Sequence, residues 1–427
     1  MTNTVFWFRR DLRLTDNTAL FEALDKKTNV LPIFIFDDNI LAELPMDDPR
    51  VYFIYRTLES LNHQLLQYNS SLLVLKGKPQ DVWRQLIQQF TIDSVFMNKD
   101  YEPYARERDT AIGKLLLKNN IHLFTFKDQV IFEESEVMKL DGSPYTVFTS
   151  YKKKWLQVYT PPLLLPEINY KNFHQAKIPF PSLNDLRLAV SETIVKDYTL
   201  DLLDDYEEKR NYPALDSTSY LGPHLRFGTV SIRQVIAQVS ASNEVFMNEL
   251  IWREFFQQIL FHFPRVVSHN FRVKYDGITW LNNEQDFRAW SVGNTGYPLV
   301  DAGMRQLNAT GYLHNRVRMV VASFLCKHLL IDWRFGEAYF AQKLLDYELA
   351  SNNGNWQWAA GTGCDAAPYF RVFNPIAQMK KFDPDLLYVK KWVPEFKSLN
   401  YVPPLVDHKY ARERAIEAYK KGLSANK

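Results

Sequence analysis

Three stretches in the second half of the chain bring flat aromatic rings close to charged or amide side chains. In "NELIWREFF", Glu249 and Trp252 are three residues apart, so on a helix they share one face. Such a carboxylate can accept hydrogen bonds from the edge of a base or ring cofactor while the indole packs on its plane. On this motif alone, a core role for Trp252 and a solvated Glu249 stay open.

The stretch "GYLHNRVRM" adds a polar–apolar pair, because Asn315 and Met319 are four residues apart and face the same way on a helix. Arg316 and Arg318 point to different faces, so one can reach phosphates while the other points inward. A single histidine on a helix is more often structural than catalytic, and we favour the structural interpretation for His314.

The stretch "LLDYELASNNGNWQW" ends in two tryptophans. Trp356 and Trp358 would share a face on a strand, but on a helix they point about 200° apart. Asparagine and glycine weaken helices, and a ring-facing role for Asn352 would justify that loss. A helix that ends near Asn353 with Gly354 as its cap explains the same residues equally well.

Two further groups of polar side chains accompany these motifs, and the second of them suits a phosphate-bearing cofactor. Asp346 and Glu348 precede the asparagines just described. Thr218 and Ser219 stand just before a helical pattern, where hydroxyls and exposed backbone N–H groups suit a diphosphate. Helix capping alone explains the two hydroxyls almost as well.

Other kinds of chemistry find no support in the sequence. The nine histidines form no pair at metal-ligand spacing, and Cys326 and Cys364 form no Cys-x-x-Cys pair, so we expect neither a metal site nor a disulfide. Neither a G-x-G-x-x-G motif nor a P-loop occurs. Aromatic residues make up 15% of the chain and the net charge is only +2, so nucleic acid would have to bind through a local patch.

The elements that position these residues follow from the hydrophobic pattern. Short β-branched and aromatic runs alternate with helical patterns before residue 130, which predicts a Rossmann-like α/β domain with a doubly wound parallel sheet. A helix is predicted over residues 50–69. The predicted strands are 5–8, 30–36, 71–77, 94–98 and 121–126.

A chain of 427 residues favours two domains. We predict the α/β domain at 1–130, an interdomain connector at 131–200 in which prolines break any helix, and an all-helical domain at 201–427. Charged residues from Arg9 onward exclude a signal peptide and no apolar run approaches a membrane span, so we expect a soluble, cytoplasmic protein.

Taken together, the motifs resemble the photolyase/cryptochrome family along nearly the whole chain. "FWFRRDLRLTDN" is similar to the family's N-terminal signature. "ELIWREF", "TGYPLVDAGMRQL", "HNRVRM" and "DWRFGEAYF" are similar to its flavin and DNA domain, and the long string "SNNGNWQWAAGTGCDAAPYFRVFNP" is the most specific of all. The resemblance is closest to class I cyclobutane pyrimidine dimer (CPD) DNA photolyases.

This resemblance implies that the helical domain binds a U-shaped FAD together with UV-damaged DNA. In the family, light excites the reduced flavin, an electron passes to a flipped-out thymine dimer, the cyclobutane ring splits and the electron returns. The expected enzyme is a deoxyribodipyrimidine photo-lyase, acting as a monomer with no obligate protein partner.

The resemblance also assigns roles by matching position. The cofactor-binding residues are Tyr206, Thr218, Ser219, Tyr220, Leu221, Gly222, Arg253, Arg318, Asp346, Tyr347, Glu348 and Asn352, with Arg318 expected to pair with Asp346. The electron-transfer residues are Trp280, Trp333 and Trp356. The DNA-binding residues are Arg210, Glu249, Trp252, Asn315, Arg316, Trp358 and Arg371. The catalytic residues are Glu249, Asn315, Met319 and Asn352, the last facing the reactive nitrogen of the flavin.

Two departures from the family pattern bear on the cofactors. Gly222 stands where many class I members carry serine, which removes one hydroxyl from the diphosphate site. Tyr104 and Ala105 stand where members with a folate antenna carry an Asn-Glu pair, so we do not expect a folate. A deazaflavin, a second flavin or no antenna chromophore at all stay open.

The family contains three alternatives to a CPD photolyase. A (6-4) photolyase would carry histidines at the positions of Asn315 and Met319, so we do not favour it. A signalling cryptochrome usually has a long C-terminal tail, whereas this sequence ends at Lys427 shortly after its last predicted helix. A DASH-type member, which prefers single-stranded DNA, is not distinguished by the sequence.

Overall fold

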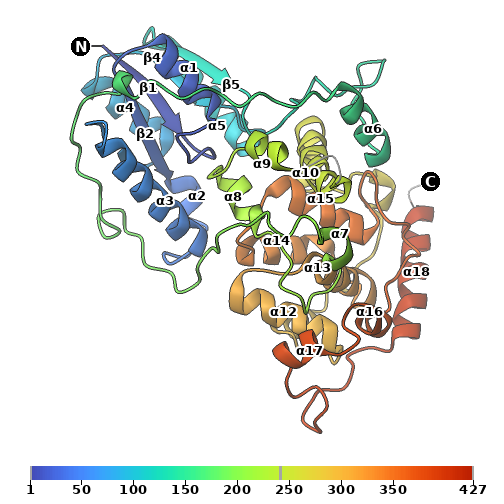
Figure 1. Cartoon of the computed structure of the whole chain (residues 1–427). Helices are drawn as coiled ribbons and strands as arrows, with labels where there is room; N and C mark the ends of the chain where they lie inside the picture. Colours follow the sequence, from blue (N-terminus) through green and yellow to red (C-terminus); the bar gives the residue numbers. More distant parts are fainter. Residues whose placement is uncertain (1, 240–242, 426–427) are drawn as a thin grey trace. The chain divides into compact units, whose positions relative to one another are not determined.

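The computed structural model describes residues 2–239 and 243–425, and these divide into two compact units (Figure 1). The α/β unit comprises residues 2–136, 158–199 and 220–239, and the helical unit comprises residues 137–157, 200–219 and 243–425. The units interleave along the chain, so the predicted limits at residues 130 and 200 do not coincide with theirs.

The α/β unit contains a parallel sheet of five strands in the order β3-β2-β1-β4-β5. Each strand lies where the sequence predicted one. The register pairs Val5 with Leu31 on one side of β1 and with Val95 on the other. The strands are β1 (Asn3–Phe8), β2 (Val30–Asp37), β3 (Leu73–Gly77), β4 (Ile92–Asn98) and β5 (His122–Phe126).

Helices cover both faces of this sheet. Along β1, Phe6 and Phe8 pack in one core with helices α1 (Thr18–Lys26) and α3 (Pro49–Leu66), whereas Val5 and Trp7 pack in a second core with α4 (Pro79–Gln89) and α5 (Pro103–Lys118). Alternation of buried side chains along a strand is what a sheet covered on both faces requires. The predicted doubly wound fold and the helix over 50–69 are confirmed.

The "FWFRRDLRLTDN" signature serves a structural purpose in this unit. The buried carboxylate of Asp128 accepts hydrogen bonds from Arg13 at 2.7 Å and from Arg233 at 2.9 Å, and Asp16 also accepts from Arg233. This ion cluster fixes α9 (Ile232–Gln238) against the loop after β1. The remaining short helices of the unit are α2 (Asp38–Leu41), η1 (Tyr170–Asn172) and α8 (Leu221–Phe227).

The helical unit has helices throughout, as predicted, and one aromatic core. None of the helices described in residues 2–239 and 243–425 is long and apolar enough to cross a membrane. The elements of the helical unit are α6 (Phe148–Val158), α7 (Tyr206–Lys209), α10 (Glu244–His262), η2 (Pro264–Val267), η3 (Val273–Tyr275), α11 (Glu284–Val292), α12 (Pro298–Thr310), α13 (Asn315–Ser323), the π-helix η4 (Phe324–His328), α14 (Trp333–Lys343), α15 (Leu349–Ala360), α16 (Pro375–Phe382), α17 (Leu387–Trp392) and α18 (His408–Ala425).

Helix α6 corrects the prediction of a connector without helices. It runs from Phe148 to Val158, after Pro144 and before the proline-rich stretch that begins at Pro161. Its residues Phe148, Tyr151 and Trp155 are buried. The prolines therefore limit only the later part of the segment, where no α-helix is described.

Helix α15 contains both Trp356 and Trp358, so the two indoles point to different sides of a helix and do not share the face of a strand. It continues through Gly354 to Ala360, and Gly361, with a φ of +84°, ends it. The interpretation in which the helix ends near Asn353 with Gly354 as its cap is wrong. Gly354 instead allows close packing, because a Cβ atom there would lie 2.1 Å from the ring of Phe256.

Candidate functional site

Helix α10 carries the predicted Glu249, Trp252 and Arg253. Glu249 accepts a hydrogen bond from Arg210 at 2.7 Å, so two residues predicted to contact DNA are bound to each other. The guanidinium of Arg210 also lies over the ring of Tyr206, 5.1 Å from its centre. Burial, reinforced by the Glu249 carboxylate, raises the pKa of Tyr206 to about 12, so this phenol remains a neutral donor.

The indole of Trp252 packs against other aromatic rings, which the sequence did not reveal. The ring of Phe148 stacks on it with centres 3.6 Å apart and planes 7° apart. Phe256 lies 5.3 Å from the same indole. Trp252 itself is half-buried. Sequence reasoning missed Phe148 because it lies about a hundred residues before Trp252, in the segment taken as a connector.

His314 caps the start of helix α13. Its Nδ1 atom accepts the backbone N–H of Arg316 at 3.1 Å, which makes it the N-cap. Burial, with Arg318 and Arg316 nearby, lowers the pKa of His314 to about 4. A neutral imidazole can accept the capping bond at physiological pH, and this agrees with the structural interpretation of His314.

The two arginines of α13 point in different directions, as expected. Arg316 donates to Asn211 at 2.6 Å and lies 3.5 Å from the sulfur of Met319. Arg318 donates to Asp346 at 2.8 Å, so the expected ion pair is present. The other carboxylate oxygen of Asp346 is buried and has no hydrogen-bond partner among the described residues.

A second carboxylate of the same segment joins α10 to the start of α15. Glu348 accepts hydrogen bonds from Arg253 at 3.1 Å and from Gln257 at 3.0 Å. The structure thus brings together two residues predicted to bind cofactor, Arg253 and Glu348. Gln257, one turn after Arg253, was not predicted; its position on the same face of α10 was the signal available in the sequence.

Asn352 faces α14. Its amide donates to the backbone oxygen of Glu337 at 3.1 Å and to the side-chain oxygen of Glu337 at 2.8 Å. Burial raises the pKa of Glu337 above its usual value, although the hydrogen bond from Asn352 opposes the shift. Glu337 lies inside the quoted "DWRFGEAYF" motif, but nothing in that motif marks it as the partner of Asn352.

The three predicted relay tryptophans belong to the aromatic core of the helical unit. Trp333 and Trp356 are buried in it, and Trp280 packs against its edge. The indole of Trp356 makes edge contacts with Phe340 at 4.9 Å and with Trp290 at 6.2 Å. Trp290 is a fully buried indole that the sequence analysis did not single out.

The remaining predicted residues lie on loops and helix starts. Thr218 and Ser219 are half-buried in the loop before α8, and the N-cap of that helix is Tyr220, with a φ of +52°. Neither hydroxyl is the capping group, so simple capping does not account for them. Leu221 and Gly222 form the first residues of α8.

The residues predicted to contact DNA differ in their exposure to solvent. Trp358 is half-buried, Asn315 is exposed, and Arg371 is exposed in the loop between α15 and α16. Arg210 and Arg316 are bound by Glu249 and Asn211, as described above, and their phosphate contacts stay a prediction.

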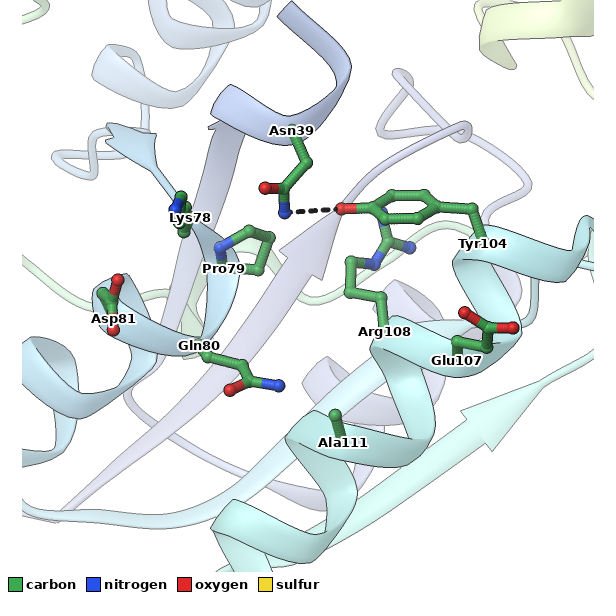
Figure 2. A pocket seen from close by; sticks show the side chains of 9 residues that line it. All are labelled: Asn39, Lys78, Pro79, Gln80, Asp81, Tyr104, Glu107, Arg108 and Ala111. Atoms are coloured by element: carbon green, nitrogen blue, oxygen red, sulfur yellow. Dashed lines mark hydrogen bonds between the residues drawn. The ribbon is translucent and has the colours of Figure 1, made fainter. Parts of the chain in front are cut away.

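The α/β unit has a cavity of about 370 Å³ at the ends of β2 and β3 (Figure 2). Figure 2 shows Tyr104 and Arg108 extending from α5 toward Asn39, which donates to the Tyr104 hydroxyl at 3.0 Å. That hydroxyl donates to Asp37 at 2.6 Å. Tyr104 thus fills its position with internal hydrogen bonds; the expected absence of a folate antenna stays a prediction.

Both units have recognised relatives. Residues 4–168 match the family model described as DNA photolyase, and residues 246–400 match the FAD binding domain of DNA photolyase. A deoxyribodipyrimidine photo-lyase from Synechococcus sp. is 35% identical, over 99% of this chain and 97% of its own length.

Two solved structures are similar to the whole chain. A bacterial class III photolyase from Agrobacterium tumefaciens is 35% identical with a TM-score of 0.88, covering 99% of this chain and 98% of its own. An archaeal photolyase from Sulfolobus tokodaii, solved with two FAD molecules, is 36% identical with a TM-score of 0.88, covering 98% of this chain and 100% of its own. The chain is a member of the DNA photolyase family.

Proposed function

We propose that this protein is a light-driven CPD photolyase, which uses reduced FAD held by the helical domain to split pyrimidine dimers in UV-damaged DNA. Its relatives are deoxyribodipyrimidine photo-lyases that align over nearly the whole chain. When bound, reduced FAD supplies the excited electron that opens the cyclobutane ring. The residues of this chain bind and orient the flavin and the dimer and exclude water from them.

The observation that carries the proposal is the carboxylate of Asp346. Arg318 binds one of its oxygens, and the other is buried without a partner among the described residues. A buried acceptor left unpaired costs free energy, so a ligand with an N–H group is the expected partner. The edge of a flavin ring carries such a group, and the residues around Asp346 therefore fit FAD.

Neighbouring groups support the same fit. Buried polar atoms of Gln257 and His314 also have no hydrogen-bond partner within the part of the chain that the structure describes. Polar groups of this kind suit the polar edge of a flavin, and Gln257 is also bound to the Glu348 carboxylate at 3.0 Å. We assign Asn352, held by Glu337 at 2.8 Å, to the position facing the reactive nitrogen.

The residues proposed to contact the substrate favour a CPD over a (6-4) lesion. Trp252 and Trp358 are half-buried indoles that can pack against a dimer, and Asn315 and Met319 provide one polar and one apolar side chain on helix α13. None of these side chains can donate a proton as an imidazolium would. Arg371 is the exposed arginine among those proposed to contact phosphate, so we expect few phosphate contacts and a modest dependence on salt.

The decisive experiment is repair itself. Photoreduced protein is mixed with an oligonucleotide that carries one thymine dimer, illuminated with blue light, and followed by the recovery of thymine absorbance. Recovery in light but not in the dark is expected. Protein with bound, reducible flavin that restores nothing would refute repair and favour a light sensor; protein that cannot bind FAD even after reconstitution would refute the flavin site. The mass of the protein in solution tests whether it acts as a monomer.

A further inference from the structure

Helix α6 packs on α10 through one aromatic face. Phe148, Tyr151 and Trp155 are spaced so that they line the same side of the helix. The Tyr151 hydroxyl and the Trp155 indole both donate to the buried carboxylate of Glu254, at 3.2 Å and 2.6 Å. Because these donors compensate a buried charge, α6 is held firmly against the helix that carries Glu249 and Trp252.

The first residue of α6 lies directly against Trp252. The rings of Phe148 and Trp252 are nearly parallel and in contact, with centres 3.6 Å apart. Phe255 makes an edge contact with each of these two rings. Phe148 is buried whereas Trp252 is half-buried, so the Phe148 ring supports the indole from inside the protein.

The start of α6 is also bound to the loop that carries Arg371. The backbone N–H of Phe148 donates to the carboxylate of Asp365 at 2.9 Å. A carboxylate at this position satisfies an otherwise unpaired N–H of the first helical turn. Asp365 lies in the loop that follows α15, six residues before Arg371. One residue, Phe148, thus joins an aromatic contact to Trp252 with a backbone contact to that loop.

We propose that Phe148 is a positioning residue for dimer recognition, which fixes the plane of the Trp252 indole before DNA binds. An indole that is already ordered pays less conformational entropy when it packs against the dimer. This inference rests on the proposed function, because it assigns to Trp252 the role of a surface for the lesion. It assigns Phe148 no contact with the DNA.

The test compares Phe148→Leu with the unchanged protein in binding a dimer-containing duplex and the same duplex without the dimer. Leucine keeps a similar apolar volume but cannot stack, so we expect roughly 3- to 10-fold weaker binding of the dimer duplex. Flavin content and affinity for undamaged duplex should not change. Phe148→Tyr, which keeps the ring, should restore tight binding. If Phe148→Leu loses its flavin, Phe148→Met provides another flexible apolar filler.

A double-mutant cycle separates positioning from a general structural effect. If Phe148 acts through Trp252, adding Phe148→Leu to Trp252→Ala should weaken dimer binding by less than about twofold further. Tyr151→Phe is the matched control, because it removes one hydrogen bond to Glu254 but keeps that of Trp155 and the contact between Phe148 and Trp252, and it should leave dimer binding unchanged. Equal losses in both backgrounds, equal losses for damaged and undamaged duplex, or no loss at all would overturn the inference. These results differ from failure of the proposed function, in which the unchanged protein itself neither prefers nor repairs the dimer.

Discussion

Replacing Gly354 with alanine should destabilise the helical unit, although the same change stabilises most helices. Gly354 lies inside α15, where alanine is favoured over glycine by about 1 kcal/mol. The added Cβ atom would lie 2.1 Å and 2.4 Å from two ring carbons of Phe256, far inside the usual contact distance of about 3.5–4.0 Å. Phe256 is buried on α10, so its ring cannot turn into solvent.

The size of the effect follows from these opposing contributions. Overpacking a core costs about 1–3 kcal/mol when neighbours must shift, and here α15 must move away from α10 or Phe256 must change its rotamer. After the gain in helix propensity is subtracted, we expect a net loss of about 1–2 kcal/mol. Because Phe256 lies 5.3 Å from the Trp252 indole, binding of dimer-containing DNA should weaken as well.

Gly113 provides the matched control. It is also a helical glycine, in α5, but a Cβ atom there would make only an ordinary contact of 3.4 Å with Leu123. Gly113→Ala should therefore raise the free energy of unfolding by about 0.5–1 kcal/mol. Urea unfolding of both variants measures whether each change lowers or raises the free energy of unfolding. A Gly354→Ala protein as stable as the unchanged one would refute the argument that α10 and α15 need this glycine to approach each other.

Three further perturbations test other contacts. Asp128→Asn removes the carboxylate that the buried Arg13 and the half-buried Arg233 share and should cost about 3 kcal/mol. Although burial alone raises it, the two arginines hold the pKa of Asp128 below its usual value. The stability that this carboxylate contributes above about pH 4 is therefore lost as the pH falls, and the variant should lose less in acid unfolding. Trp358→Ala should weaken binding of damaged DNA while flavin absorbance stays, and loss of the flavin instead would contradict its assignment to the substrate pocket. Lys327→Met removes a buried amino group that donates to the Ala360 carbonyl at 2.7 Å. Because the Tyr419 hydroxyl also donates to that carbonyl, the change should lower the free energy of unfolding by only about 1 kcal/mol, measured by urea titration.

The fold was predictable to the extent that it depends on local pattern. The five strands were readable because β-branched and aromatic residues are concentrated in short runs between helical repeats. Helix α6 was missed because the prolines that follow it dominate the composition of its segment. The continuation of α15 past Gly354 could not be predicted from propensity either. It depends on how closely Phe256 approaches, and propensity carries no information about distant neighbours.

Prediction of the site was limited in the same way, because local pattern does not show which distant residues meet in the fold. Pairing of Arg318 with Asp346 could be expected because both positions match a known pattern. The partners Glu337 and Phe148 could not, since each meets its counterpart only through tertiary packing. The pairing of Arg210 with Glu249 shows a further limit of residue type. An arginine suited to a phosphate suits a nearby carboxylate equally well, and the contact of Arg210 with DNA stays a prediction.

The carboxylates of the site differ in their partners, and this difference assigns them different roles. Asp346 and Glu348 each accept a hydrogen bond from an arginine, at 2.8 Å and 3.1 Å. Glu337 is bound by the Asn352 amide, and burial raises its pKa. Two of the groups are therefore oriented by arginines, whereas Glu337 is oriented by an amide. Because Asn352 is held by that carboxyl, we expect its proposed contact with the flavin to depend on a titratable neighbour.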